Sequence, residues 1–210
     1  MSTYTFPFDT CEKPQKSGIA QHYSVFVNII TCSIVLYFMY KTKSNYAFLL
    51  LLALLIFELF HTLSHFIHIK GKFLYTITHI AGFLFNIAFL NFLYRYTNVF
   101  PNTYYIIFLC FILLCDLYAF FNLSFIYFIL TQITLFIAIL FYYYNLLPSN
   151  IQYNIKIILG STIVIYLAFL NEKLNCKNML KYEPNFPFHM IIEALSIIPI
   201  YILSKTFYNL

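Results

Sequence analysis

Residues 46–69, YAFLLLLALLIFELFHTLSHFIHI, decide the fold of this chain. A helix needs about 20 predominantly apolar residues to cross a bilayer, and this stretch is long enough. Its ionisable and imidazole side chains gather in its second half, at positions 58, 61, 65 and 68, which lie on one face of a helix. Such side chains are costly in hydrocarbon and normally face a bundle interior, a partner or a water-filled cavity. The stretch therefore predicts a membrane helix that carries a polar site.

Six more apolar stretches of similar length occur in the 210-residue chain. The chain is 62% hydrophobic and 9% charged, with a mean hydropathy of +0.80, whereas about a quarter of the residues of a soluble domain are charged. We predict an all-α integral membrane protein, a seven-transmembrane-helix bundle with short loops. The predicted spans lie near 20–40, 46–69, 73–94, 103–121, 123–146, 151–170 and 187–205. Six spans remain an alternative, because the boundary at Asn122 is weak.

The domain organisation is simple: a polar N-terminal segment, 1–19, precedes a single membrane domain, 20–210. The N-terminal segment contains Asp9, Glu12 and two prolines and has no apolar core, so it does not resemble a cleavable signal peptide. The net charge of +5 is spread over loops, which suits anionic lipid headgroups and provides no nucleic-acid patch. By itself, the distribution of lysines weakly places the N-terminus in the cytoplasm.

Several ionisable residues share one depth in the predicted bundle. With seven crossings, the N-terminus and the loops at 69–72 and 171–187 lie on the same face. Counted from these loops at 1.5 Å per residue, four side chains fall within roughly 3–12 Å of that face. They are His68, His79, His189 and Glu193. Residues far apart in sequence are thus predicted to meet at one end of the bundle.

The types and spacing of these residues suit a catalytic zinc site, which has three protein ligands and an open fourth position. His189 and Glu193 have the i, i+4 spacing of two ligands on one helix, and His68 supplies a third from the second span. Ser64, one turn from His68, could donate a hydrogen bond to an oxyanion, and His79 could act as general acid or base. A zinc ion so held would supply a nucleophile at neutral pH.

Structural explanations apply to the other members of the stretch. His61 and His65 are equally well explained as interhelical hydrogen-bonding groups. Glu58 is more readily explained as a partner of His61 at i, i+3 than as a functional group.

Four local motifs, in order, carry a resemblance to a known family. They are FDTCEKP (8–14) followed by SGIAQ (17–21), Ser64-x-x-x-His68, NEKLNC (171–176) and His189-x-x-x-Glu193. Together they resemble the alkaline ceramidase family, within a superfamily of seven-helix membrane hydrolases that includes progestin/adiponectin receptor-like proteins. The resemblance implies a zinc amidase that cleaves the N-acyl bond of ceramide, or a similar lipid amide, to a sphingoid base and a fatty acid.

The resemblance also implies roles for individual residues. His68 and His189 would be zinc ligands and Ser64 the oxyanion helper. Glu193 stands where the family has a second His, and two His with one Glu form a known catalytic zinc set. His79 stands where the family has its Asp base. A second assignment therefore stays open, in which His68, His79 and His189 bind the metal and Glu193 is the base.

The N-terminal motif implies a calcium site and a disulfide. Asp9 and Glu12 match carboxylate positions of the family's calcium site, but Gln21 replaces a Glu, so we expect calcium binding to be weak or absent. Cys11 and Cys176 match a cysteine pair that the family joins. A disulfide would place the N-terminal face in an oxidising lumen or outside the cell, in an endomembrane or the plasma membrane. This expectation outweighs the narrow lysine margin.

Two other function classes remain to be distinguished from a lipid amidase. A receptor-like member of the superfamily would hold a lipid or metal without turnover. A proton- or metal-transporting bundle would need polar residues through the full membrane depth, but residues 48–57 of the second span are wholly apolar.

Overall fold

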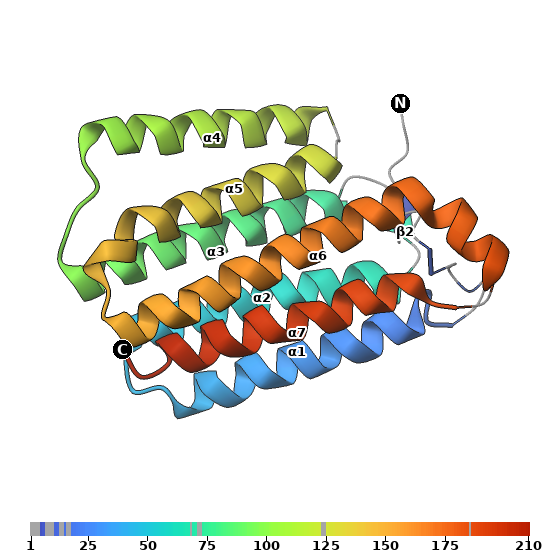
Figure 1. Cartoon of the computed structure of the whole chain (residues 1–210), viewed down its shortest axis with the longest axis horizontal. Coiled ribbons are helices and arrows are strands. Elements are labelled where there is room, and N and C mark those ends of the chain that lie inside the picture. The colour runs from blue at the N-terminus through green and yellow to red at the C-terminus, as the bar shows by residue number, and fades with distance from the viewer. Residues whose placement is uncertain are drawn as a thin grey trace.

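The computed structural model describes residues 5–6, 11–12, 15, 18–67, 69–70, 73–122, 125–184 and 186–210. Within these ranges the chain forms seven α-helices that run side by side (Figure 1). They are α1 (His22–Lys41), α2 (Asn45–Phe66), α3 (Phe73–Thr97), α4 (Thr103–Phe121), α5 (Phe125–Tyr143), α6 (Ser149–Tyr182) and α7 (Phe188–Phe207). A 3-10 turn, η1 (Tyr144–Leu146), follows α5, and the strands β1 (Thr5–Phe6) and β2 (Ile69–Lys70) pair antiparallel.

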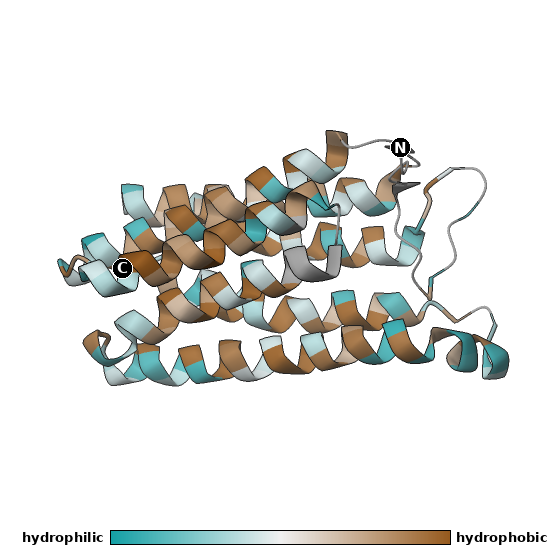
Figure 2. Cartoon of the chain, turned by 90° about the horizontal axis from the view of Figure 1, so that it is seen from above, coloured by the Kyte–Doolittle hydropathy of each residue, from teal (hydrophilic) through white to brown (hydrophobic). Residues whose placement is uncertain are grey.

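The outer surface of the bundle is that of a membrane protein. By length and composition, α1, α2, α3, α6 and α7 can each cross a membrane; the searched parts of α4 and α5 contain shorter apolar runs. Large apolar side chains that are more than half exposed cover the outside, among them Phe26, Phe111, Leu114 and Phe141. Figure 2 shows apolar residues along most of the length of the helices. The predicted all-α bundle is confirmed, and its long apolar helices are compatible with a membrane protein; the number of crossings stays a prediction.

The prediction of a loop at 171–187 is wrong for residues 171–182, which are helical. Helix α6 continues without a break to Tyr182 and ends just before Pro184. Residues 171–182 contain no Pro or Gly and are rich in good helix formers, so nothing in this sequence stops the helix. The additional turns project beyond the apolar part of the bundle as a hydrophilic helix end (Figure 2).

Helix starts are capped by local and by distant side chains. The Ser44 hydroxyl accepts a hydrogen bond from the Ala47 N–H (3.3 Å) at the start of α2. The start of α1 is capped instead by Glu12, whose two carboxylate oxygens accept from the Tyr23 N–H (3.1 Å) and the Ser24 hydroxyl (2.5 Å). A negative charge at this position also suits the positive end of the helix dipole. Glu12 is therefore held against the start of α1.

The main apolar core fills one half of the bundle. Its fully buried members come from the end of α1, the start of α2, the ends of α3 and α5, the start of α6 and the end of α7. They include Val35, Leu50, Phe89, Ile155 and Phe207. Because consecutive helices run in opposite directions, these positions all lie at the end of the bundle away from the start of α7. The other end is left for polar side chains.

Phe207→Ala is expected to destabilise this core by about 3–5 kcal/mol, because it removes a buried aromatic ring. The ring of Phe207 makes edge contacts with those of Phe89 and Phe92, at centroid distances of 5.5 and 5.3 Å. Thermal unfolding of the purified protein in detergent measures the loss. Phe26→Ala, which removes a side chain that is 67% exposed, is the control. Equal effects of the two substitutions would contradict the described core.

Candidate metal centre

Helices α2 and α7 bring two imidazoles and a carboxylate together at the polar end of the bundle. His61 and His65 lie one turn apart on α2, and their Nε2 atoms are 3.3 Å from each other. Each Nε2 lies 3.5 Å from Oε1 of Glu193 on α7. Glu193 is 3% exposed and His65 is equally buried, whereas the side chain of His61 is 30% exposed. We call His61, His65 and Glu193 the metal group, because their donor atoms all lie within 4.8 Å of one another.

The spacing of these atoms fits a tetrahedral metal ion. Bonds of 2.0–2.2 Å from a zinc ion place its donor atoms about 3.3–3.6 Å apart. The three distances within the metal group are 3.3, 3.5 and 3.5 Å. Three ligands leave a fourth position, which is the arrangement of catalytic rather than structural zinc sites. The metal group can therefore hold a metal ion.

A third imidazole lies directly beside the metal group. His189 is one helical turn before Glu193 on α7, and its Nε2 is 3.0 Å from Glu193 Oε1. Its ring also lies against that of His65, with centroids 5.2 Å apart. Three imidazole nitrogens thus converge on a single carboxylate oxygen.

The outer nitrogens of two of these rings are held by acceptors. Nδ1 of His65 lies 2.5 Å from Oε1 of Gln21, and Nδ1 of His189 lies 2.8 Å from Oε2 of Glu172. Metal-binding histidines in general donate their other ring N–H to a carboxylate, a carbonyl or water, which fixes the ring and its tautomer. Both rings are therefore oriented with Nε2 towards Glu193.

Glu58 occupies the corresponding place behind His61. Its Oε2 is 3.6 Å from His61 Nδ1, and its carboxylate is buried. Glu58 also lines an apolar cavity of about 200 Å³, together with Leu54, Phe57, Phe85 and Phe136 among others. The expected pairing of Glu58 with His61 is thus present, and it connects the metal group to the cavity.

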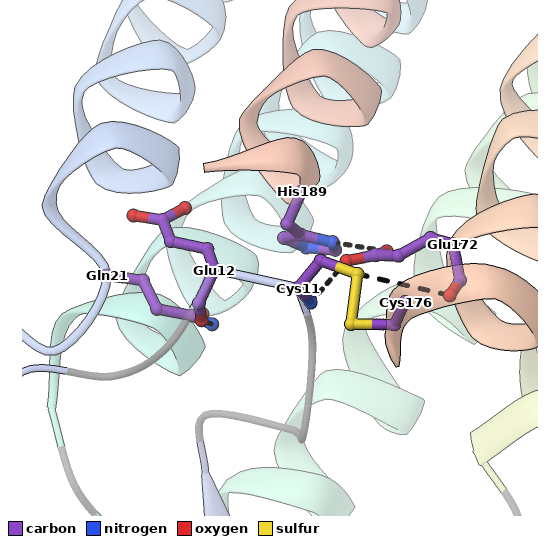
Figure 3. The surroundings of a disulfide bond; sticks show 6 residues. All are labelled: Cys11, Glu12, Gln21, Glu172, Cys176 and His189. Atoms are coloured by element: carbon purple, nitrogen blue, oxygen red, sulfur yellow. Dashed lines mark hydrogen bonds and ion pairs between the residues drawn. A yellow bond between two sulfur atoms is a disulfide. The ribbon is translucent and has the colours of Figure 1, made fainter. Parts of the chain in front are cut away.

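Glu172 is linked to the N-terminal segment as well as to His189. The structure joins Cys11 to Cys176 by a disulfide, the pairing that the resemblance implies. The Cys11 N–H donates to Oε1 of Glu172 (2.7 Å), one turn before Cys176 on α6. Figure 3 shows Glu172 between Cys11 and His189.

The predicted ligands are only partly among the described residues. His68 lies outside them, so the set of His68, His189 and Glu193 stays a prediction. Glu193 belongs to the metal group, and His189 contacts it. His61 and His65, which packing explained equally well, are the two histidines that complete the group.

The predicted catalytic residues lie outside the metal group. The Ser64 hydroxyl donates to the carbonyl of His61 in its own helix (2.6 Å). His79 on α3 donates from Nδ1 to the carbonyl of Tyr75 (3.1 Å), and its ring packs against those of Tyr75 and Phe120. The described residues that could share a metal include neither Ser64 nor His79.

Of the two predicted calcium ligands, only Glu12 is among the described residues. Asp9 lies outside the described residues. Both carboxylate oxygens of Glu12 accept hydrogen bonds at the start of α1. Glu12 therefore has a structural role as a helix cap, and weak or absent calcium binding stays the prediction.

Sequence reasoning missed Glu172 and Gln21 as partners of the site. Glu172 was expected in a loop, and Gln21 was considered only as a lost calcium ligand. Their roles depend on contacts between distant segments, for which neither residue carries a local signal. His61 and His65 did carry one, because their i, i+4 spacing is the same as that of His189 and Glu193.

Comparisons of the chain with protein-family models, curated proteins and solved structures give no match. The geometry of the metal group is therefore the main basis for a functional assignment.

Elemental analysis of protein purified without chelators is expected to find about one transition-metal ion per chain, as three convergent ligands imply. Glu193→Ala and His65→Ala should each lose it, because each removes a buried donor of the metal group. Glu183→Ala, at an exposed position after α6, should retain it. His189→Ala and His68→Ala test the predicted ligand set. Wild-type protein without metal would contradict the assignment.

Proposed function

We propose that this chain is a zinc-dependent membrane amidase that hydrolyses the N-acyl bond of ceramide or a similar lipid amide. The products are a sphingoid base and a fatty acid. One observation carries the proposal: three imidazole Nε2 atoms converge on buried Glu193, and each ring has an acceptor near its Nδ1. Histidines that only pack do not need Nε2 directed at a shared centre and an acceptor at Nδ1, whereas metal-binding histidines generally have both.

Zinc is proposed because the metal group offers three ligands, two imidazole nitrogens and one carboxylate oxygen, which is a donor set that catalytic zinc sites use. The same donor set also suits ferrous iron, so the elemental analysis identifies the metal as well as counting it. The resemblance to zinc hydrolases favours zinc. A zinc ion at His61, His65 and Glu193 would polarise a substrate carbonyl and supply a nucleophile at neutral pH.

The protein residues around this centre have the chemistry that amide hydrolysis needs. The leaving amine must receive a proton, and His189 is held between two carboxylates, those of Glu172 and Glu193. An imidazole oriented by a carboxylate is a common proton-transfer group. The resemblance adds Ser64 as oxyanion helper and His79 as a further acid or base, and both roles remain part of the proposal.

The apolar cavity supports a lipid substrate. It lies between α2, α3, α5, α6 and α7, and its lining is almost entirely apolar. Glu58 belongs both to this lining and to the surroundings of His61. An acyl chain in the cavity would therefore place its amide end near the metal group. The disulfide supports a lumenal or extracellular position of this end of the bundle.

A receptor-like binding protein is the second candidate. Its site would be closed if His189, whose Nε2 lies 3.0 Å from Glu193 Oε1 beside the metal group, became a fourth ligand. Zinc sites closed by four protein ligands are structural rather than catalytic. A closed site with a lipid in the cavity would bind without turnover.

The amidase and the receptor-like protein are distinguished by an assay in mixed micelles. It measures the release of fatty acid from a ceramide with a labelled acyl chain. The amidase is expected to lose activity with a chelator, regain it with zinc, and show only background activity as Glu193→Gln. Glu183→Gln is the matched control, since it makes the same change at an exposed position. Bound zinc without any fatty-acid release would reject the amidase and favour the receptor-like function.

A further inference from the structure

Glu172 connects the disulfide to the metal group. It lies four residues before Cys176 on the projecting end of α6, and its carboxylate is buried although the neighbouring positions 171 and 173 are exposed. One oxygen accepts from the Cys11 N–H (2.7 Å), and the other faces His189 Nδ1 (2.8 Å). Figure 3 shows the carboxylate between these two partners. The orientation of His189 therefore depends on a carboxylate that Cys11 helps to hold.

A second connection runs from the same segment to α2. The carbonyl of Glu12, next to Cys11, accepts from Gln21 Nε2 (2.7 Å). Gln21 Oε1 in turn lies 2.5 Å from Nδ1 of His65, and the Gln21 N–H donates to the His65 carbonyl (3.0 Å). Residues 11 and 12 thus touch the partners of two different imidazoles, one on α7 and one on α2.

The disulfide is the covalent part of this arrangement. It closes a loop of sequence separation 165, so it restricts the unfolded chain and keeps Cys11 beside α6 in the folded protein. Without it, Cys11 would be held near Glu172 only by hydrogen bonds. The Glu12 cap on α1 and the β1–β2 pair do not involve the disulfide and would keep the segment near the bundle. Opening the disulfide should therefore loosen Glu172 without unfolding the helices.

We propose that the Cys11–Cys176 disulfide controls metal affinity at His61, His65 and Glu193, with Glu172 as the positioning residue. The inference rests on the proposed metal site and adds its regulation. In the disulfide form, Glu172 is fixed and holds His189 against Glu193. Reduction releases Glu172, so the His189 ring is no longer held against Glu193 and the metal group binds its ion less tightly. The site is then assembled only on an oxidising side of the membrane.

The reduction step consumes two electrons and two protons. The S–S bond breaks and each sulfur becomes a thiol, while a dithiol reductant is oxidised to its own disulfide. In the experiment a trialkylphosphine replaces the dithiol, because dithiols bind zinc. The phosphine supplies the two electrons and takes the oxygen of one water molecule, whose protons end on the two thiols.

The affinity of the full-length protein for zinc is measured in detergent before and after phosphine treatment. Loss of an outer partner of a metal ligand costs about 10–100-fold in affinity. His189 is such a partner of Glu193 and is held by Glu172, so the reduced protein is expected to show a loss of this size. The absorption spectrum of the cobalt-substituted protein should change at the same time, because it reports the geometry around the ion. Unchanged affinity and spectrum after complete reduction would overturn the proposal.

Three variants test whether the effect of the disulfide reaches the metal group through Glu172. The double variant Cys11→Ser/Cys176→Ser should bind zinc as weakly as the reduced protein and no longer respond to phosphine, which excludes an effect of the free Cys32, Cys110 and Cys115. Glu172→Gln keeps the disulfide but loses the carboxylate. It should bind weakly and respond little to phosphine, whereas Glu172→Asp should recover part of the affinity.

The outcomes distinguish this inference from the proposed function. A full response to phosphine in Glu172→Gln would reject Glu172 as the positioning residue. A disulfide form that binds no metal would reject the metal site itself. Tight binding that does not change on reduction would reject only the control by the disulfide.

Discussion

The buried carboxylate of Glu193 is the constraint on which the polar end of this protein depends. A carboxylate that is 3% exposed inside an apolar helical bundle loses its hydration, at a cost of several kcal/mol unless other groups compensate. Three imidazoles surround one of its oxygens, two from α2 and one from α7 itself. Their presence fixes α2 against α7 at this level. The same arrangement that makes the buried charge tolerable creates a set of donors for a cation.

The second layer around this carboxylate ties the rest of the chain to it. Gln21 at the start of α1, Glu58 on α2 and Glu172 on α6 each stand behind one imidazole. The N-terminal segment covers two of these three through Cys11 and Glu12. The apolar core at the other end supplies the packing that holds the helices together. One half of the bundle thus provides stability, and the other half provides a polar site.

Helix periodicity predicted much of the fold but could not select the site residues. Seven apolar stretches predicted the helices, and the common depth predicted for His68, His79, His189 and Glu193 pointed to the end of the bundle that contains Glu193. The face formed by positions 58, 61 and 65, however, extends about 10 Å along α2, whereas one ion needs donors within a few ångströms. Periodicity identifies such a face but not the level at which α7 meets it. That level places His61 and His65 opposite Glu193.

The length of the apolar part of α6 matches the thickness of a bilayer. This part, residues 149–170, spans about 33 Å, close to the roughly 30 Å of a hydrocarbon core. If this part of α6 crosses the hydrocarbon core, Glu172 stands just outside it, and its contact with His189 puts that residue at the same level. Glu193 follows one helical turn, about 6 Å, further in. This is the depth of the boundary between headgroups and acyl chains, so a lipid could reach the metal group by lateral diffusion, without leaving its leaflet.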